Sequence, residues 1–328
     1  MAQRPAALSE FELITRFFTH RTRGATLGVG DDAALVRVRR GNELAVSVDM
    51  LVEGHHFFSN ADPALLGHKA LAVNLSDLAA MGATPRWTTL ALALPRVDPR
   101  WLEAFSRGFM ALARRHGVDL VGGDTTRGPL AICVQIMGEV PIGKALRRDG
   151  AKVGDDVWVS GQLGEAATAL SAIKGRMRLP ARERRALEQR LHAPIPRVTL
   201  GLALRGVARS AIDISDGLVA DLGHICERSK VRAVIEWEAI PANPTVRFHA
   251  QSEPGAQALL AGGDDYELCF TASRRRRSDV TRAAGRARVL VTRIGRIESA
   301  ARATGSVQVL DSVGKPLRLK ARGYDHFR

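Results

Sequence analysis

The sequence has few cysteines and no long apolar run. Its three cysteines, Cys133, Cys226 and Cys269, lie far apart and form neither a zinc-ligand pattern nor a disulfide framework. No stretch of about 18 apolar residues occurs, which excludes a membrane-spanning helix. Residues 1–10 lack the apolar core of a secretion signal. We therefore expect a cytoplasmic protein, in a compartment that keeps thiols reduced.

Several common nucleotide-binding and nucleophile motifs are also missing. Gly143-Lys144 and Gly314-Lys315 are followed by Ala and Pro, so there is no P-loop. The protein-kinase signatures H-R-D and D-F-G are absent, and so is the G-x-S-x-G motif of serine nucleophiles. Residues 27–32 contain G-x-G without a third glycine, which makes a poor dinucleotide fingerprint. Phosphates would then be held through a metal ion and a few arginines.

Aromatic residues make up only 5% of the chain, whereas the net charge is +14 with 48 Lys and Arg residues. These basic residues, mostly arginines, are spread along the chain, with the densest run at 274–277. A nucleic-acid binder usually concentrates its charge on one face and adds aromatic stacking residues. We therefore interpret the surplus as solvated surface and expect no nucleic-acid partner. A phosphorylated small substrate would also be attracted to such a surface.

The length of 328 residues and the mixture of helical and strand patterns indicate two domains of α/β or α+β class. Strands are expected at 44–52, 87–94, 131–140, 157–160, 211–215 and 266–271. Helices are expected at 10–20, 62–82, 98–117, 163–174, 181–192, 197–208 and 217–229. The chain turns polar and glycine-bearing near 144–152. We place the boundary there, which gives domains of 1–145 and 146–328.

Acidic residues gather beside glycines and at the ends of expected strands. They are Asp31, Asp32, Asp49, Asp124, Asp213, Asp216, Asp264 and Asp265. Glycine lets the backbone approach a ligand closely, and carboxylates are the usual protein ligands of Mg²⁺. Asp-Gly pairs are also common in turns that bind nothing, so a purely structural explanation stays open for each cluster.

Asp77 differs because it lies inside an expected helix. At helical spacing it shares a stripe with Leu66, Ala70 and Val73. An acid on an apolar stripe should be paired or should bind a metal ion. The alternative is a helix rotated so that Asp77 faces solvent.

Two further polar segments leave more than one role open. Ser215, within Ile214-Ser-Asp-Gly217, is interpreted as a turn or ligand-contact residue and not as a nucleophile. His55 and His56 follow Glu53-Gly54. Neighbouring residues of a strand point to opposite faces, so one of these histidines could face a pocket. A structural role stays open for both.

Taken together and in this order, seven segments resemble the bacterial thiamine-phosphate kinase family, of the aminoimidazole-ribonucleotide-synthetase-like superfamily. The resemblance covers nearly the whole chain. The segments are Gly28-Val-Gly-Asp-Asp32, Val48-Asp-Met-Leu-Val-Glu-Gly-His-His-Phe57, Lys69-Ala-Leu-Ala-Val-Asn-Leu-Ser-Asp-Leu-Ala-Ala-Met-Gly-Ala83, Gly122-Gly-Asp-Thr-Thr-Arg127, Asp213-Ile-Ser-Asp-Gly-Leu218, Gly262-Gly-Asp-Asp-Tyr-Glu-Leu268 and Gly323-Tyr-Asp-His-Phe327.

The resemblance implies phosphorylation of thiamine monophosphate by ATP, through direct in-line transfer assisted by several Mg²⁺ ions and without a protein nucleophile. It implies an α+β N-terminal domain that dimerises through its sheet, an α/β C-terminal domain, and a site in the cleft between them. The implied metal ligands are Asp32, Ser47, Asp49, Asp77, Asp124, Asp213 and Asp216. The implied nucleotide contacts are Gly123, Asp124, Arg148 and Ser215, and the implied substrate contacts are His56, Asp264 and Tyr324.

Two residues depart from the family pattern. Val48 stands where threonine is frequent, so any contact there must come from its backbone carbonyl. Asp264 stands where glutamate is usual, and a water could bridge the missing methylene. The alternatives are another ATP-using enzyme of the superfamily, such as aminoimidazole ribonucleotide synthetase or selenide water dikinase, and a basic nucleic-acid-binding protein. The dikinase typically carries a reactive Cys or Sec near its N-terminus, where this chain has none.

Overall fold

The computed structural model describes residues 9–300, 304–320 and 323–324. Residues 1–8 lie outside this range, and the expectation of no secretion signal partly rests on them. Asp325 to Phe327 of the last family segment also lie outside it. The chain forms two compact units. The N-terminal unit ends at Ile142, and the C-terminal unit begins at Gly143 and also includes Ala79–Ala83.

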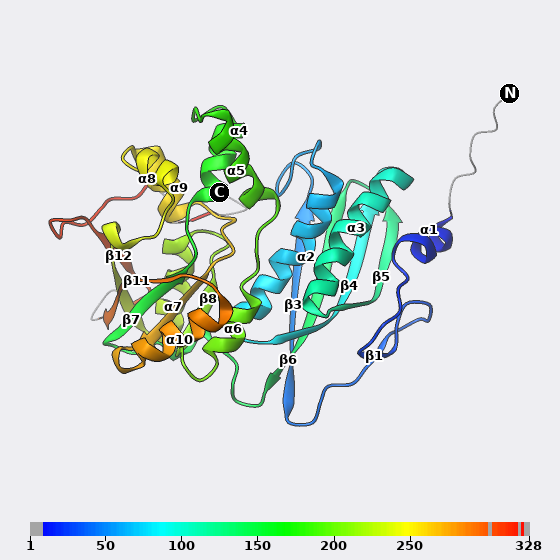
Figure 1. Cartoon of the computed structure of the whole chain (residues 1–328), viewed down its shortest axis with the longest axis horizontal. Helices are drawn as coiled ribbons and strands as arrows, with labels where there is room; N and C mark the ends of the chain where they lie inside the picture. The colour runs from blue at the N-terminus through cyan, green and yellow to red at the C-terminus, as the bar shows by residue number, and fades with distance from the viewer. Residues whose placement is uncertain (1–8, 301–303, 321–322, 325–328) are drawn as a thin grey trace. The chain divides into compact units, whose positions relative to one another are not determined.

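The N-terminal unit is built on a four-stranded sheet in the order β3-β6-β4-β5. The strands are β3 (Asn42–Val52), β6 (Ala131–Pro141), β4 (Thr84–Leu94) and β5 (Asp119–Arg127). β6 is antiparallel to both β3 and β4, whereas β4 and β5 are parallel. Two long helices, α2 (Pro63–Ala80) and α3 (Pro99–His116), cover one face of this sheet (Figure 1). The remaining elements are α1 (Glu10–Phe17), β1 (Ala25–Leu27) and β2 (Leu35–Val36).

The ends and the crossing of these two helices follow from local sequence. Asp62 and Asp98 each precede a proline and accept backbone N–H bonds from the first turn of α2 and α3. The two helices approach closely at glycines. A Cβ on Gly67 would lie 2.1 Å from the Phe105 carbonyl oxygen, and one on Gly108 would lie 1.9 Å from that of Ala64. Any larger residue at either position would push the helices apart.

The outer face of β3 is apolar and exposed. Leu44, Val46, Val48 and Met50 alternate along the strand and are 41–59% exposed. Residues of the other parity, including Ser47 and Asp49, are on the opposite face and are less exposed. β3 is also an edge strand, because it pairs only with β6. The N-terminal unit therefore has an apolar surface at the edge of its sheet.

The C-terminal unit has a six-stranded, mostly antiparallel sheet in the order β12-β9-β11-β7-β10-β8. The strands are β7 (Asp155–Ser160), β8 (Ser210–Asp213), β9 (Val231–Glu236), β10 (Leu268–Ser273), β11 (Val291–Ser299) and β12 (Val307–Leu310). The helices are α4 (Glu165–Ile173), α5 (Ala181–His192), α6 (Val198–Leu204), α7 (Leu218–Ser229), α8 (Pro244–His249), α9 (Glu253–Ala261) and α10 (Arg277–Ala287), with short 3-10 turns η1 (Arg148–Gly150), η2 (Trp237–Ala239) and η3 (Arg274–Arg276).

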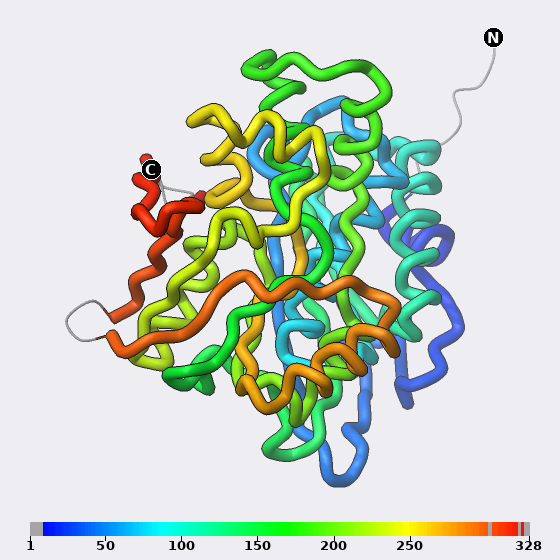
Figure 2. Tube along the Cα trace, turned by 60° about the vertical axis from the view of Figure 1, so that its left-hand side comes forward, coloured from blue at the N-terminus to red at the C-terminus, as the bar shows by residue number. Residues whose placement is uncertain are grey.

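The central strands of this sheet are buried on both faces. Val157, Val159 and Cys269 belong to a core that also includes residues of α4, α5, α7 and α9. Trp158 and Phe270 point to the other face, where their rings stack with centroids 6.4 Å apart. Figure 2 follows α8 and α9, in yellow, beside the green segment that contains α4. The short apolar runs at 157–159 in β7 and 268–270 in β10 thus reflect cover on both sides.

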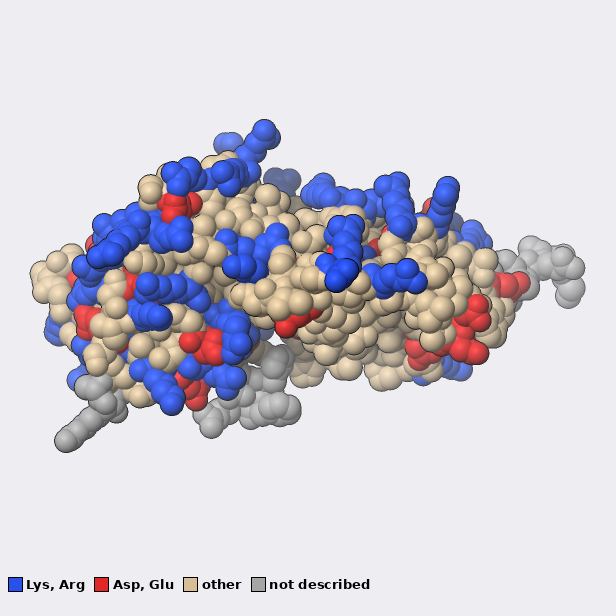
Figure 3. Space-filling model, turned by 90° about the horizontal axis from the view of Figure 1, so that it is seen from below, with Lys and Arg blue, Asp and Glu red and all other residues tan. Residues whose placement is uncertain are grey.

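The basic residues are dispersed over the surface that Figure 3 presents. Lys and Arg side chains cover parts of both units, with Asp and Glu among them. Many arginines pair with acids, as Arg276 does with Asp279 and Arg184 does with Glu188. No helix within the described part of the chain is long and apolar enough to cross a membrane.

Candidate active site

The N-terminal unit brings Ser47 and Asp77 into direct contact. Ser47 lies on the β3 face that carries Asp49, and its hydroxyl donates a 2.5 Å hydrogen bond to Oδ2 of Asp77 on α2. Leu66, Ala70 and Val73 of the predicted stripe are buried, and Asp77 itself is half-buried. Val48 points to the opposite face, so its side chain does not take part in this group.

The pairing register of the sheet places Asp49 of β3 and Gly123 of β5 in the same row of residues across the strands. Asp49 pairs with Val134, Val134 with Leu90, and Leu90 with Gly123, so Asp124 follows the end of this row. Gly123 has φ +156°, and a Cβ on it would lie 1.8 Å from the Leu90 carbonyl oxygen. Only glycine fits there. The expectations that Asp49 ends a strand and that Asp124 lies in a turn were wrong, since both lie within strands.

Asp32 and His56 lie on turns of the N-terminal unit. Asp32 is exposed, just after Gly30, whose φ of +126° favours glycine. His56 lies in the turn after β3, where its Nδ1 accepts the Val52 N–H at 3.0 Å. The neutral ring then carries its proton on Nε2, which makes that atom a donor. The two histidines follow each other in a turn, so the strand argument about opposite faces does not apply to them.

In the C-terminal unit, Asp213 ends β8 and the chain then passes through Ser215, Asp216 and Gly217 to α7. Asp213 is buried, with 5% of its surface exposed. Asp221 of α7 is also buried, and its Oδ2 accepts the N–H groups of Ser215, Asp216 and Gly217 at 3.0–3.1 Å. Burial, and then the nearby charges of Asp213 and Asp216, raise the pKa of Asp221 to about 8. Asp213, Asp216 and Asp221 therefore lie close enough for their charges to interact.

The candidate substrate residues contact the same loop through their backbones. The N–H of Asp264 donates to the Ser215 carbonyl at 2.8 Å, and the N–H of Tyr324 donates to the Asp216 carbonyl at 3.0 Å. The Asp264 carboxylate accepts a 3.0 Å bond from the Tyr266 hydroxyl. Tyr324 is 53% exposed. The structure thus brings four of the predicted contact residues together: Ser215, Asp216, Asp264 and Tyr324.

Arg148 lies apart from that loop in sequence, in the 3-10 turn η1, and its side chain is exposed. Its backbone is anchored, because its carbonyl accepts a 2.8 Å bond from the Ser229 hydroxyl at the end of α7. Neighbouring Arg147 instead pairs with Asp149 at 2.6 Å. The structure therefore fixes the backbone of Arg148 and presents its guanidinium to solvent, as a phosphate contact requires.

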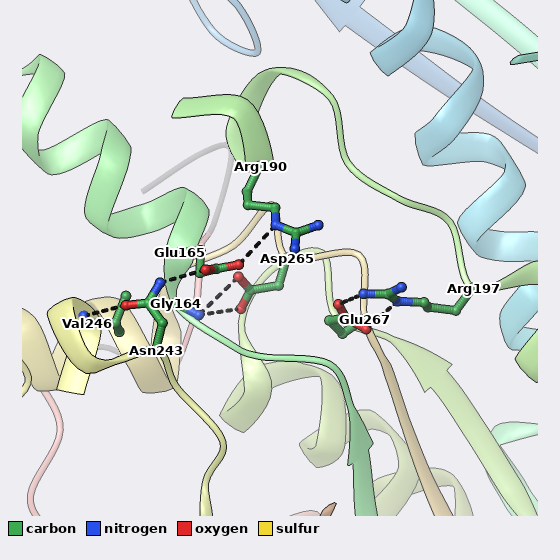
Figure 4. Close-up of polar contacts among 8 residues, drawn as sticks. All are labelled: Gly164, Glu165, Arg190, Arg197, Asn243, Val246, Asp265 and Glu267. Carbon is green, nitrogen blue, oxygen red and sulfur yellow. Dashed lines mark hydrogen bonds and ion pairs between the residues drawn. The ribbon is translucent and has the colours of Figure 1, made fainter. Parts of the chain in front are cut away.

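A polar network beside Asp264 was not anticipated from the sequence (Figure 4). Glu267 is buried and accepts from Arg197 through both carboxylate oxygens, and also from the Ser160 hydroxyl. Asp265 accepts the Gly164 N–H through both of its oxygens at 3.0 Å. Glu267, Arg197 and Asp265 line a small pocket together with Arg190 and Asp264. The glycine-rich segment around residues 262–268 was the only sequence signal for it.

The candidate ligands suit Mg²⁺ in their chemistry, since they are carboxylates and one hydroxyl. Asp32, Ser47, Asp49, Asp77 and Asp124 belong to the N-terminal unit, whereas Asp213 and Asp216 belong to the C-terminal unit. Over residues 9–300, 304–320 and 323–324, no group of three or more His, Cys, Asp or Glu could hold a metal ion. Because the candidate ligands are divided between the two units, each unit supplies only part of the set.

Comparison with known proteins identifies the class. Residues 30–140 match the N-terminal domain of AIR synthase related proteins, and residues 152–308 match the C-terminal domain. The chain is thus a two-domain protein of the AIR synthase related class, with an α/β fold.

Relatives and solved structures narrow this class further. The chain is 44% identical to thiamine-monophosphate kinase of Salmonella typhimurium, over 98% of this chain and 99% of the relative. It resembles the crystal structure of thiamine-monophosphate kinase from Stenotrophomonas maltophilia K279a with a TM-score of 0.81 and 47% identity, covering 87% of this chain and 91% of the other. It resembles AaThiL complexed with AMPPCP and TMP with a TM-score of 0.76 and 32% identity, covering 91% and 92%. The chain belongs to the thiamine-monophosphate kinase family and is an enzyme of the kinase class.

Proposed function

We propose that the chain transfers the terminal phosphoryl group of ATP to thiamine monophosphate, forming thiamine diphosphate. The observation that carries the proposal is the likeness to AaThiL complexed with AMPPCP and TMP, which extends over 91% of this chain. The backbone bonds from Asp264 to Ser215 and from Tyr324 to Asp216 support it, because they join candidate substrate contacts to a candidate nucleotide contact and a candidate metal ligand.

The transfer is proposed to be direct and in line, with no phosphorylated enzyme. The acceptor is a phosphate oxygen of the substrate, which is already ionised near pH 7 and needs no strong general base. The protein must mainly align two phosphorylated molecules and reduce their repulsion. We assign nucleotide contacts to Gly123, Asp124, Arg148 and Ser215, and substrate contacts to His56, Asp264 and Tyr324.

We further propose that Mg²⁺ assists this transfer. The candidate ligands are Asp32, Ser47, Asp49, Asp77, Asp124, Asp213 and Asp216. The hydroxyl–carboxylate contact of Ser47 with Asp77, and the proximity of the acids Asp213 and Asp216 to Asp221, both suit a hard cation. When bound, Mg²⁺ would neutralise phosphate charge and orient the transferred group. Candidate ligands come from both proposed domains, 1–145 and 146–328. Both domains would therefore be required to bind the metal ions.

We also propose that two copies of the chain form a dimer through the exposed face of β3. Leu44, Val46, Val48 and Met50 form an apolar stripe on an edge strand, where a second copy would bury it. The proposed compartment is the cytoplasm, where ATP is abundant. The free cysteines Cys133, Cys226 and Cys269 suit its reducing conditions.

The test is product analysis after incubation with ATP, Mg²⁺ and thiamine monophosphate. Anion-exchange chromatography should show thiamine diphosphate and ADP in equal amounts. Free thiamine should be a poor acceptor, because it lacks the ionised phosphate oxygen. Absence of thiamine diphosphate would contradict the proposal. ATP consumption with selenide or an aminoimidazole precursor instead would assign the chain to another activity of the superfamily.

A further inference from the structure

A single buried carboxylate oxygen anchors the loop that leads into α7. Asp221 is 2% exposed, and its Oδ2 accepts the N–H of Ser215 at 3.1 Å, of Asp216 at 3.0 Å and of Gly217 at 3.1 Å. Three successive N–H groups can share one acceptor only if their peptides turn around it. The conformation of the loop is therefore set by the position of this one oxygen.

The carbonyl side of the same loop is held as well. Ile214 accepts from the N–H of Tyr266 at 2.8 Å, Ser215 from that of Asp264 at 2.8 Å, and Asp216 from that of Tyr324 at 3.0 Å. The loop is thus bonded to Asp221 on one side and to three more distant residues on the other.

Two glycines make this close packing feasible. A Cβ on Gly263 would lie 2.2 Å from the Ser215 carbonyl oxygen. A Cβ on Gly217, which has φ +117°, would lie 2.7 Å from backbone atoms of Ala261. The loop therefore has little room to shift while Asp221 holds it, and a shift would also move the segment that carries Asp264.

We propose that Asp221 is a positioning residue for phosphoryl transfer, which aligns the Ser215–Asp216 loop with Asp264 and Tyr324. This inference rests on the proposed function, in which Ser215 contacts nucleotide, Asp216 binds metal, and Asp264 and Tyr324 contact substrate. Asp221 acts through hydrogen bonds to the loop backbone and touches neither reactant. Its loss should then disturb nucleotide and acceptor together.

Two substitutions separate this role from a general need for negative charge. Asp221→Asn keeps one acceptor oxygen for the three N–H groups, whereas Asp221→Ala removes every acceptor. We expect Asp221→Ala to lower kcat/KM for both ATP and thiamine monophosphate by about 100-fold, as small misplacements of reacting groups do. Asp221→Asn should stay within about threefold of the parent enzyme, because the acceptor is retained.

The matched control is Ile225→Ala, one turn further along α7. Ile225 is fully buried in the same core and makes no bond to the loop. This variant should lower the melting temperature, as a core cavity does, while kcat/KM of the folded enzyme stays close to the parent value. Assays are run well below the melting temperature of each variant, so that a loss of activity does not report unfolding.

Two readouts do not depend on turnover. Hydrogen exchange of a peptide covering residues 213–220 should be about tenfold faster in Asp221→Ala and unchanged in Asp221→Asn, because the bonds that protect these amides are lost or kept. Calorimetric binding of AMPPCP should weaken in Asp221→Ala alone. If the parent enzyme makes no thiamine diphosphate, the proposed function fails, and these two measurements still decide whether Asp221 holds a nucleotide loop.

Two results would overturn the inference. One is an Asp221→Ala variant that keeps parental kcat/KM, loop exchange and AMPPCP binding. The other is an Asp221→Asn variant as impaired as Asp221→Ala, since charge and not hydrogen bonding would then be what the loop requires.

Discussion

The hydroxyl of Ser47 on β3 donates a 2.5 Å hydrogen bond to the carboxylate of Asp77 on α2. These residues are thirty positions apart in the chain, and both are candidate metal ligands. The helix places Asp77 over the one face of β3 that also carries Asp49. An acid on an apolar stripe of a helix is thereby given a polar partner, without being moved to the surface.

Asp77→Asn tests whether this acid serves a metal ion or the fold. Asparagine has nearly the same size and can still accept the Ser47 bond, but carries no charge. If Asp77 binds Mg²⁺, turnover should fall by well over tenfold, since each 1.4 kcal/mol of lost transition-state stabilisation costs about that factor. Unfolding in urea without metal should change by no more than about 1 kcal/mol.

The matched control for this test is Asp62→Asn at the start of the same helix. Asp62 is exposed and caps α2, a task that asparagine performs equally well, so neither turnover nor stability should change. A loss of about 3–5 kcal/mol in Asp77→Asn with near-normal turnover would show that Asp77 pairs with a buried cation and supports the fold.

Gly123→Ala should be far more damaging than Gly122→Ala. A Cβ on Gly123 would lie 1.8 Å from the Leu90 carbonyl, whereas the nearest atom to one on Gly122 is a Thr89 methyl at 3.9 Å. Forcing β5 away from β4 should cost about 3 kcal/mol or more, and Gly122→Ala should cost less than about 1 kcal/mol. Urea unfolding of the two variants compares neighbours in the same strand. Equal stabilities would show that β5 does not approach β4 as described.

Arg197→Met should destabilise the C-terminal unit strongly. The side chains of Arg197 and Glu267 are 14% and 8% exposed, and removal of the arginine leaves a buried carboxylate without its cation. The expected loss is about 3–5 kcal/mol. Arg184→Met removes half of the exposed pair with Glu188 and should cost about 0.5 kcal/mol or less. If both variants lost a similar, small amount of unfolding free energy, the buried pair would contribute no more to stability than the exposed pair.

Val46→Glu tests the proposed dimer. A glutamate in the middle of the β3 stripe would have to be buried without a partner when two copies meet, which should weaken association by at least about 100-fold. Light scattering after gel filtration should then show a monomer where the parent chain is a dimer. Val153→Glu, at an exposed position of the C-terminal unit, should leave the dimer intact. A parent chain that is monomeric at every concentration would refute the proposed interface.

Local signals in the sequence located several elements, and failed where long-range pairing decides the structure. Asp98-Pro99 and Gly117 marked α3 closely, because caps are local. β3 begins at Asn42, two residues before the expected range, because β6 pairs with it from Pro141. β9 was not predicted, since its partners β11 and β12 come much later in the chain.

The same limit applied to the candidate site. The motifs indicated which acids could bind a ligand, but not that Asp221 would hold three backbone N–H groups, because an acid in the first turn of a helix is ordinary. Glu267 lay within a recognised segment. Only its partners Arg197 and Ser160, distant in sequence, reveal that it is buried and paired.

Asp265→Asn should change how the stability of the chain depends on pH. Asp265 is partly buried, and desolvation raises its pKa well above the ordinary value of 3.8, although the N–H of Gly164 opposes the shift. The charges of Glu267, Glu165 and Asp264 raise it further. Above pH 3.8 the unfolded chain loses this proton while the folded chain keeps it, so folding becomes less favourable as the pH rises.

Asparagine resembles the protonated carboxyl and still accepts the Gly164 N–H, but it has no proton to lose. The stability of Asp265→Asn relative to the parent chain should therefore increase from about pH 4 upward, by at most about 1.4 kcal/mol per pH unit, until the parent carboxyl ionises. Urea unfolding of both proteins across this range measures the difference, and other titrating groups cancel in it.

Asp279→Asn provides a control of opposite sign. Hydrogen bonds from Arg276, together with the charge of Arg282, lower the pKa of Asp279, so this acid contributes its stability above pH 3.8 and loses it as the pH falls. Its replacement should give no gain at neutral pH. If the stability of Asp265→Asn relative to the parent is independent of pH, the Asp265 carboxyl titrates in the folded chain as it does in the unfolded chain, and the raised pKa is refuted.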